Sequence, residues 1–584
     1  MTSTNHRLSQ ILGHLGDIYQ YMGIEERFRA LAYTKAARTI DNLKDDITIY
    51  IKNNTLEDIP GIGESIAEKI IEFVHTGKIR KYEELKKKVP LELLDLMSVS
   101  GFGPQSLRQI HSELNITTRA QLIKALEDGR ISKLKRFGAK KVENMMRGLK
   151  LQKQSQERIL WWQAKEIGDR IKAELGQLKE VRKIEVAGSI RRGKETVGDI
   201  DILVSCAPAH RKKVIQAFTL LSNRKMVIAK GETRASILIN DFDRQVDLRV
   251  INAQEWGAAL LYFTGSKEHN VYLRTLAKQE ELKINEYGVF RIKDGHKVAG
   301  SSEEEIYRVF GFQYIPPELR EMNGEFELAA KGKIPALIEL GEMKGDMQMH
   351  STWSDGAMDI EALARHVMEH YPYAYIVLTD HSVSSRIAGG KDEKSFRKQF
   401  VEIDRVNQKL GRHMIRNGVE VDILPDGSLD LKDDLLVEMD WVCASIHSGF
   451  AHDNTSRLVK ACQHPLVNCI GHPSGRLIGK REAYGVDWKK LFSVAARTGT
   501  AIEINAQPDR MDLSDTLARQ AREAGVMLTI STDSHSAENF SFMKCGITVA
   551  RRAGCEASDV LNTKSWKEVE AFVKRKRKKQ NRKP

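Results

Sequence analysis

Two aspartates separated by one residue stand in the stretch GSIRRGKETVGDIDILV, residues 188–204. Side chains two apart on a strand point to the same face, so Asp199 and Asp201 present their carboxylates together. Asp247, in the strand-like run RQVDLRV, would complete a cluster of carboxylates. Such oxygen ligands, together with substrate phosphates, suit Mg²⁺. A pair of these ions would activate a 3′-hydroxyl and stabilise a pyrophosphate leaving group, so the pattern predicts a nucleotidyltransferase site.

The surrounding residues favour such a site over a surface acidic pair. Ile200 and Ile202 make the run a buried strand, where an aspartate without a cation is costly. Gly188 and Ser189 begin a turn into a helix, and this turn could cradle a triphosphate. Arg192 could then neutralise the triphosphate charge.

The second half of the chain holds a denser set of metal-ligand residue types. Six segments each place them just after an apolar strand-like run, namely MQMHSTWSDG, LTDHS, GVEVDI, ASIHSG, IGHPSG and STDSHS. The candidate ligands are His350, Asp355, His381, Glu420, His447, His472, Asp533 and His535. A lone histidine is usually structural, but a set of this size predicts a metal centre for Zn²⁺, Mn²⁺ or Fe²⁺.

Two glycine turns near the N-terminus have the same apolar–x–Gly–apolar–Gly pattern. They are DIPGIGES, with Pro60, Gly61 and Gly63, and SVSGFGPQ, with Gly101 and Gly103. A tight turn before a helix exposes backbone N–H groups, which can bind a phosphate without side-chain charge. Repetition favours helix–hairpin–helix motifs that hold the DNA backbone over ordinary helical hairpins.

The predicted secondary structure around these residues changes from helices to strands along the chain. Residues 1–150 have helical patterns, and residues 155–180 predict one long helix. Strand patterns follow from residue 183, then a helical stretch near 256–282. After residue 345, strands alternate with helices, which predicts an α/β barrel with its chemistry at the C-terminal ends of the strands.

Composition sets limits on the function. The net charge of +13 favours a polyanionic partner such as nucleic acid. Eight basic residues fall between Lys574 and Lys583, and this stretch is either a solvated disordered tail or a tail that grips DNA. Neither a signal peptide nor a membrane span is expected, because continuous apolar runs are short. The six cysteines lack a C-x-x-C pair, so free buried thiols in a reducing cytosol are expected.

The first half resembles the family X DNA polymerases, such as polymerase beta. LLYFTGSKEHN and INEYGV, together with the GS…DxD pattern and the glycine turns, carry this resemblance over about residues 1–315. It implies that Asp199, Asp201 and Asp247 bind the catalytic metals. It also implies a nucleotide-binding set of Gly188, Ser189, Arg192, Gly198, Tyr262, Phe263, Gly265, Asn270 and Arg274. Val197 departs from the family, which has a further triphosphate-binding serine there.

Members of the same family can also have deoxyribose-phosphate lyase activity, which needs a lysine that forms a Schiff base. Lys69 matches the family's Schiff-base lysine and Tyr33 a supporting residue. Ser65 and Glu57 stand where polymerase beta has phosphate-binding lysines. The favoured interpretation of Lys69 is therefore a helix-surface lysine that contacts DNA.

The second half resembles the polymerase and histidinol phosphatase (PHP) domain over about residues 340–570. That family binds up to three metals through nine ligands, and eight of the nine match here. The departure is Gln348, which replaces the first histidine of the usual H-x-H. Glu420 matches the carboxylate that bridges two metals. The resemblance implies a 3′→5′ exonuclease or 3′-end-processing activity, attached to a bacterial or archaeal polymerase that fills short gaps in DNA repair.

The predicted fold is therefore multidomain: a helical helix–hairpin–helix region, an α+β nucleotidyltransferase palm and a C-terminal α/β, distorted TIM-like PHP barrel. The predicted boundaries are 1–85 (N-terminal helical domain), 86–153 (second helix–hairpin–helix subdomain), 154–260 (palm), 261–318 (nucleotide-selection subdomain), 319–344 (linker), 345–572 (PHP domain) and 573–584 (basic tail).

The expected cofactors are Mg²⁺ or Mn²⁺ in the palm and up to three Mn²⁺, Zn²⁺ or Fe²⁺ ions in the PHP domain. The expected partners are gapped or nicked DNA and deoxynucleoside triphosphates, bound by a cytoplasmic, nucleoid-associated monomer. Two alternatives stay open: an end-processing nuclease whose polymerase half mainly binds DNA, and a repair scaffold with an inert PHP domain.

Overall fold

The computed structural model describes residues 4–580, except 42, 44–45, 60, 99–100, 144, 147–148 and 150–157. The chain forms two compact units, which are described separately. The first comprises Met1–Gln154 with Gly479–Glu482, and the second comprises Ser155–Ile478 with Ala483–Pro584. Pro60 and the predicted boundary at 153/154 lie outside the described residues.

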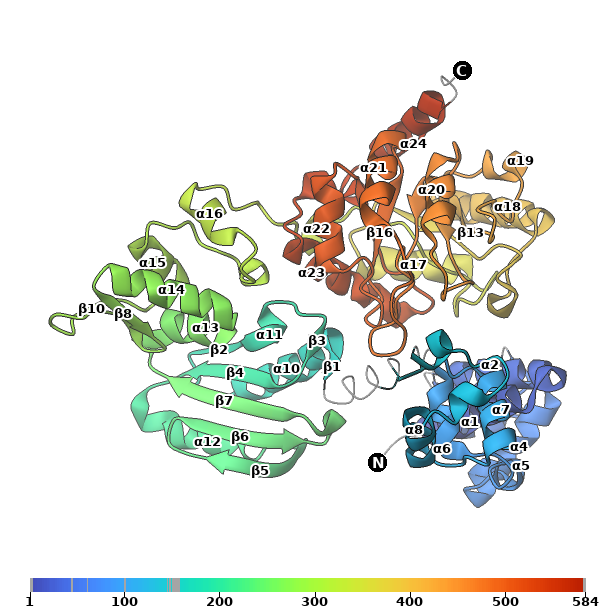
Figure 1. Ribbon diagram of the computed structural model, residues 1–584, viewed down its shortest axis with the longest axis horizontal. Coiled ribbons are helices and arrows are strands. Elements are labelled where there is room, and N and C mark those ends of the chain that lie inside the picture. Colours follow the sequence, from blue (N-terminus) through green and yellow to red (C-terminus); the bar gives the residue numbers. More distant parts are fainter. Residues whose placement is uncertain are drawn as a thin grey trace. The chain divides into compact units, whose positions relative to one another are not determined.

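Among its described residues, the first unit contains helices joined by turns and loops (Figure 1). Its helices are α1 (Thr4–Met22), α2 (Arg27–Asp41), α3 (Ile47–Asn53), α4 (Glu64–Thr76), α5 (Arg80–Leu85), α6 (Leu91–Leu94), α7 (Pro104–Leu114) and α8 (Arg119–Glu127). Helix α4 shows why they pack. Ile66, Ile70 and Phe73 recur at helical spacing and are all buried, and the left-handed Gly77 ends the helix.

The palm subdomain, residues 158–251, is built on a sheet with the strand order β2-β4-β7-β6-β5. The strands are β2 (Lys183–Val186), β4 (Ile200–Ser205), β5 (Arg224–Lys230), β6 (Arg234–Ile239) and β7 (Gln245–Ile251). Ile202 and Val204 point to the face covered by α10 (Trp161–Gly176) and α12 (Arg211–Phe218). Leu203 points to the other face, where it packs against α13 (Trp256–Thr264). The alternating apolar pattern thus buries both faces of β4.

The nucleotide-selection subdomain follows, with α13, α14 (Lys267–Gln279), α15 (Glu303–Val309) and the antiparallel strands β8 (Leu282–Asn285), β9 (Gly288–Arg291) and β10 (Lys297–Ala299). The segment expected as a linker, 319–344, contains α16 (Glu325–Ala330). Phe326 and Ala329 of this helix are buried in the same core as Leu273 and Tyr307. This part of the segment therefore packs with the subdomain before it.

The C-terminal domain is a seven-stranded parallel sheet in the order β11 to β17. The strands are β11 (Gly345–Asp346), β12 (Tyr375–Leu378), β13 (Ile415–Asp422), β14 (Trp441–Ser445), β15 (Cys469–Ile470), β16 (Ala501–Asn505) and β17 (Leu528–Ser531). A parallel bridge between Met349 and Ser534 joins the two ends of the sheet, so the barrel is nearly closed. The predicted helical region, palm and PHP-like barrel are confirmed.

Helices alternate with the barrel strands and cover them from outside (Figure 1). They include α17 (Ile360–His370), α18 (Glu393–Leu410), α20 (Thr455–Gln463), α21 (Trp488–Thr498), α22 (Asp515–Glu523) and α23 (Met543–Arg552). Strands β12 and β14 are buried along their whole length, as expected for parallel strands covered on both faces. All six cysteines are free and buried, as predicted.

Much of the predicted basic tail is helical. Helix α24 (Trp566–Gln580) runs through it, and Lys576 is buried with its ammonium donating to the Thr500 hydroxyl and the Cys462 carbonyl. Burial lowers the pKa of Lys576 to about 8. Residues 581–584 lie outside the described part of the chain. No described helix has the length and apolar character to cross a membrane.

Candidate active sites

The aspartates predicted in the palm lie at the adjacent ends of two neighbouring strands. Strands β4 and β7 are parallel, and Asp201 lies opposite Asp247 in their register. Asp199 directly precedes β4. Burial, together with the charges of Asp199 and Asp247, raises the pKa of Asp201 to about 7. Mutual repulsion of this kind is what a divalent cation would relieve, so the oxygen donor set fits Mg²⁺ or Mn²⁺.

The glycine turn beside these carboxylates has no room for a side chain. Gly188 has φ +60°, and a Cβ there would lie 2.4 Å from Oδ2 of Asp201. The turn continues as the single helical turn α11 (Gly188–Arg191), which carries Ser189. Gly188 thus lets the chain turn directly against the carboxylate cluster.

Arg192 links this turn to the nucleotide-selection subdomain. Its guanidinium donates to the Thr264 carbonyl, and its Nε lies 3.1 Å from Oε1 of Glu321. A Cβ at Gly265 would lie 3.1 Å from its Nη1, so the left-handed Gly265 lets the guanidinium approach the backbone. The structure brings Arg192 and Gly265 together, as the predicted nucleotide site requires.

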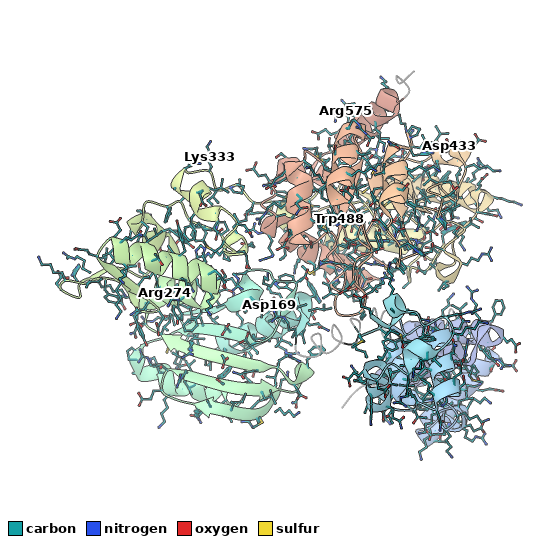
Figure 2. All side chains as sticks on the ribbon, viewed as in Figure 1. Asp169, Arg274, Lys333, Asp433, Trp488 and Arg575 are labelled. Atoms are coloured by element: carbon teal, nitrogen blue, oxygen red, sulfur yellow. The ribbon has the colours of Figure 1, made fainter. Side chains whose placement is uncertain are left out.

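The other predicted nucleotide residues gather on α13 and α14. Tyr262 and Phe263 lie in the last turn of α13, and their rings pack edge to face. The Asn270 amide donates to the Tyr262 carbonyl at 2.8 Å. Arg274, one turn further along α14, is exposed (Figure 2). Tyr262, Asn270 and Arg274 line one pocket, whereas Gly198 lies beside the Arg158 guanidinium.

The predicted DNA-binding glycines stand before helices, as expected. Gly63 precedes α4, and Gly103 precedes α7, which has Pro104 in its first turn. A Cβ at either glycine would meet no atom within 4 Å, so a side chain at either position would enter open space. Gly61 and Gly101 are left-handed, with φ of +90° and +93°, and make the turns.

Lys69 lies in an open cavity of about 1220 Å³ in the first unit, together with Tyr33, Gly61 and Gly63. Its ammonium donates to the Ser65 carbonyl at 2.7 Å and to the Ser65 hydroxyl at 3.0 Å. Burial raises the pKa of Tyr33 to about 12. Lys69 thus lies on an exposed face of its helix, and it shares a cavity with the Gly61–Gly63 turn.

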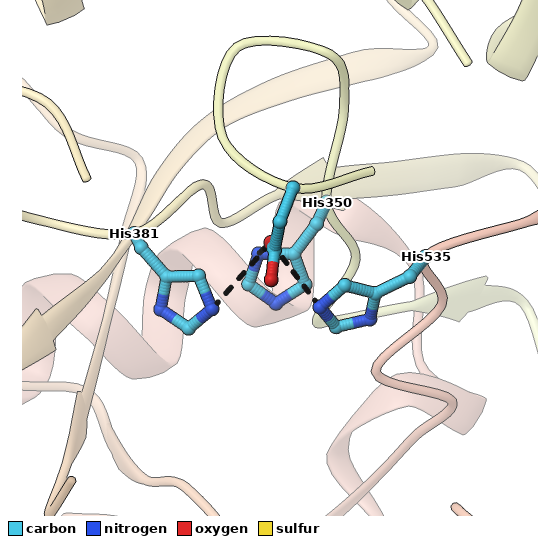
Figure 3. A group of neighbouring side chains, drawn as sticks. His350, His381 and His535 are labelled. Atoms are coloured by element: carbon cyan, nitrogen blue, oxygen red, sulfur yellow. Dashed lines mark ion pairs between the residues drawn. The ribbon is translucent and has the colours of Figure 1, made fainter. Parts of the chain in front are cut away.

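In the barrel, all eight predicted metal ligands converge at the C-terminal ends of the strands. Three overlapping groups form: His350, Asp355, His381 and His535; His381, Glu420 and His447; and His350, Glu420 and Asp533. The atoms in each group lie within 4.8 Å of one another. Figure 3 shows the first group, in which His381 and His535 lie on either side of the Asp355 carboxylate. His472 approaches Glu420 at 2.9 Å.

Glu420 lies at the centre of this set. One of its carboxylate oxygens is 3.1 Å from Nδ1 of His381, and the other is 3.4 Å from Nε2 of His447. Burial opposes ionisation of Glu420, but the surrounding histidines hold its pKa well below its usual range. This central position suits a carboxylate that bridges two cations.

The histidines respond to this environment in opposite ways. Burial lowers the pKa of His381 to about 4. Burial also acts on His350, but Asp533, Asp355 and Glu420 outweigh it and raise its pKa to about 9. The buried Nδ1 atoms of His350 and His472 have no hydrogen-bond partner in the described part of the chain. Unpartnered imidazole nitrogens beside shared carboxylates fit a transition-metal centre.

Gln348 lies beside this centre. It is 1% exposed, its Oε1 accepts from the Cys443 thiol at 3.1 Å, and its carbonyl accepts from the Asp533 amide. Its Nε2 has no hydrogen-bond partner among the described residues. The Cys443 thiol therefore donates to the side-chain oxygen of Gln348. This oxygen is the atom that would take the place of an imidazole nitrogen as a metal ligand.

Sequence reasoning missed the residues that orient the ligands. Asp422 lies 2.6 Å from Nδ1 of His447, and the Asn505 amide donates to Asp533 at 3.0 Å. Asp422 follows Glu420 by two residues on one strand, and that spacing in GVEVDI was the available signal. Asn505 carried no comparable signal, because its contact joins residues 28 positions apart.

Comparison with family models agrees with this division of the chain. Models of the DNA polymerase beta palm and thumb match residues 158–241 and 259–321. A helix-hairpin-helix domain model matches residues 3–79, and a SAM-like helix-hairpin-helix tandem model matches residues 93–151.

Among curated proteins, the "DNA polymerase/3'-5' exonuclease PolX" of Bacillus subtilis (strain 168) is 38% identical over 562 residues, covering 96% of this chain and 97% of that protein. DNA polymerase lambda of Rattus norvegicus is 26% identical over 55% of this chain and 57% of its own length. A "probable phosphatase" of Thermoanaerobacter sp. (strain X514) is 30% identical over 31% of this chain and 76% of its own length.

Proposed function

The chain belongs to the family X DNA polymerases that carry a C-terminal PHP domain, and from this premise we propose that it fills short gaps in DNA and trims 3′ ends. One observation supports the proposed polymerase activity. Asp201 and Asp247 lie opposite each other on parallel strands, and burial, together with the charges of Asp199 and Asp247, raises the pKa of Asp201 to about 7. A cluster of this kind is arranged for divalent cations.

The protein's own groups would position the nucleotide. The carboxylates of Asp199, Asp201 and Asp247 would supply oxygen ligands for the cation. A bound Mg²⁺ or Mn²⁺ would activate the 3′-hydroxyl there. Arg192 would neutralise the triphosphate, and the Gly188 turn would offer its backbone to the phosphates. Tyr262, Phe263, Asn270 and Arg274 would contact the nucleotide and the templating pair.

Primer extension tests this half directly. Labelled DNA with a one-nucleotide gap is incubated with deoxynucleoside triphosphates and Mg²⁺ or Mn²⁺. Extension by one nucleotide supports the proposal. Bound but unextended DNA supports a repair scaffold, and shortened DNA without extension supports an end-processing nuclease.

The barrel is proposed to hydrolyse the phosphodiester at a 3′ end. Its ligand groups share Glu420 and His350, so neighbouring cations would be held by common side chains. A bound Mn²⁺, Zn²⁺ or Fe²⁺ would supply an activated water and neutralise the phosphate charge. Asp422 orients His447 through its 2.6 Å contact, and Asn505 orients Asp533.

Gln348 would give this barrel a preference for Mn²⁺. An amide oxygen is a harder and weaker donor than an imidazole nitrogen, and Mn²⁺ tolerates oxygen ligands better than Zn²⁺ does. The cation held by His350, Glu420 and Asp533 would therefore exchange more readily. Degradation of a labelled 3′ end over a Mn²⁺ titration tests this, and no degradation at any concentration would indicate an inert barrel.

DNA binding is proposed to rest on the N-terminal glycine turns. Their open helix N-termini suit backbone phosphates, which are read without regard to sequence. Lys69 would contribute a phosphate contact in its cavity, and incubation with borohydride and an abasic substrate would reveal any Schiff base. We also propose that the chain acts as a cytoplasmic, nucleoid-associated monomer on gapped or nicked DNA.

A further inference from the structure

Helix α23 of the barrel packs against the palm turn that carries Arg192. Gly193 has φ +67°, and a Cβ there would lie 2.3 Å from Cγ2 of Thr548. The last residue of the helix, Arg552, is 4% exposed and donates to the Arg192 carbonyl at 2.6 Å. The barrel therefore touches the main chain of the proposed triphosphate-binding arginine.

A single carboxylate oxygen joins the two arginines. Oε1 of Glu321 lies 3.1 Å from Nε of Arg192 and 3.1 Å from Nη1 of Arg552. Arg552 also pairs with Asp515 at 2.6 Å. These four side chains balance in charge, and none is exposed by more than 27%. The more exposed Lys194 lies 4.0 Å from the other oxygen of Glu321. Pairs at such distances are little screened by salt when they are this buried.

The geometry points to a positioning role for Arg552 in nucleotide binding, and we infer that it determines how readily Glu321 releases Arg192 to the triphosphate. The inference rests on the proposed role of Arg192. When Arg192 turns to the triphosphate, Glu321 loses one buried arginine and keeps the other. Without Arg552, release of Arg192 would leave this largely buried carboxylate with only the more exposed Lys194, 4.0 Å from its other oxygen, which costs free energy. Nucleotide affinity in the palm would thus depend on a residue of the barrel.

Single-nucleotide insertion kinetics on gapped DNA test this, with full-length protein throughout. For R552Q we expect the KM for the nucleotide to rise about tenfold, with kcat within about twofold, because coupled buried charges typically interact at this level. In E321Q/R552Q, the competing charge is gone, so KM should return to within about threefold of wild type.

Two matched controls separate this from a general interface effect. Arg551 makes a comparable contact between the same parts, to Glu318 at 2.7 Å, but does not touch Arg192. D515N removes the other partner of Arg552 and leaves Glu321 shared. R551Q and D515N should therefore keep KM within about twofold of wild type. The exonuclease rate of every variant monitors the integrity of the barrel.

The outcomes are distinct. If wild type inserts no nucleotide, the proposed polymerase function itself fails. If wild type inserts but R552Q has an unchanged KM, the inference is wrong. The inference is equally overturned if R551Q raises KM as much as R552Q does, or if E321Q fails to restore KM in the R552Q background.

Discussion

The palm and the barrel hold their carboxylates in contrasting ways. In the palm, burial and then the like charges of Asp199 and Asp247 raise the pKa of Asp201 to about 7. In the barrel, histidines surround Glu420 and keep its pKa well below its usual range. The barrel thus supplies its own counter-charges. In the palm, Arg249 and Arg192 offset the effect on Asp201 only in part, and divalent cations that arrive with the nucleotide would supply the rest. This contrast favours a resident metal centre in the barrel and a substrate-assembled one in the palm.

The largest expected effect separates the two sites by activity. Asp201→Asn keeps the shape beside Gly188 but removes a charge that is proposed to bind metal. Extension should fall at least about 100-fold, since the metals stabilise the transition state directly, while 3′→5′ degradation stays within about twofold. Parallel extension and degradation assays on the same gapped DNA measure both. Unchanged extension would contradict the proposed metal role of Asp201.

The same variant tests the electrostatic contrast through stability. A folded pKa near 7 against an ordinary value of 3.8 means that the neutral form of Asp201 favours folding. That stability is present below about pH 4 and is lost as pH rises through 7, by up to about 4 kcal/mol. Asp201→Asn should therefore stabilise the metal-free palm at pH 8 and have little effect at pH 4. Thermal unfolding in a chelator at both pH values checks this, and equal shifts at the two would contradict it.

The converse experiment removes a ligand from the barrel. His381 belongs to two of the three ligand groups, so His381→Ala should lower degradation at least about 100-fold and reduce bound metal. Extension should stay within about twofold. His413→Ala, an exposed histidine of the same domain, is the matched control. Metal analysis after dialysis and the two activity assays decide the outcome, and full degradation by His381→Ala would remove it from the site.

A subtler change addresses the departure at Gln348. Gln348→His replaces the amide held by Cys443 with an imidazole, which should raise metal retention after dialysis about tenfold. Gln348→Ala removes the side chain without adding a ligand and serves as the comparison. The Mn²⁺ concentration for half-maximal degradation should fall for Gln348→His and rise for Gln348→Ala. No difference between the two would show that residue 348 lies outside the metal sites.

The sequence predicted the strands that hold the sites, because their apolar residues alternate or run continuously. Both patterns are local, as in β4 and β14. Helix α16 was not predicted, since six residues carry too little periodicity to reveal that Phe326 and Ala329 are buried. Nor does composition show that Lys576, within a basic stretch, is buried against Cys462 and Thr500.

The same limit applies to the sites. The sequence showed which residue types stand at each strand end. It did not show which distant residues these side chains contact. Glu321 meets Arg192 across 129 residues and Arg552 across 231. Only the folded arrangement of α23 against the palm brings these three together. Pairings between distant segments depend on packing that a single sequence does not encode locally.

The smallest expected effect concerns the first unit, which is proposed to bind DNA through backbone N–H groups. Gly103→Val adds a side chain in the open space before α7 without a left-handed backbone to strain it. The protein should stay folded, while a phosphate could no longer approach the helix N-terminus. Binding to gapped DNA should weaken about fivefold, and by the same factor for every base sequence, because backbone contacts carry no sequence information. The matched control is Gly77→Asn, at the far end of α4, where asparagine tolerates the left-handed conformation. Fluorescence anisotropy over several gap sequences and salt concentrations measures the effect. A loss confined to some sequences, or an equal loss in Gly77→Asn, would show that the glycine turn is not the phosphate contact.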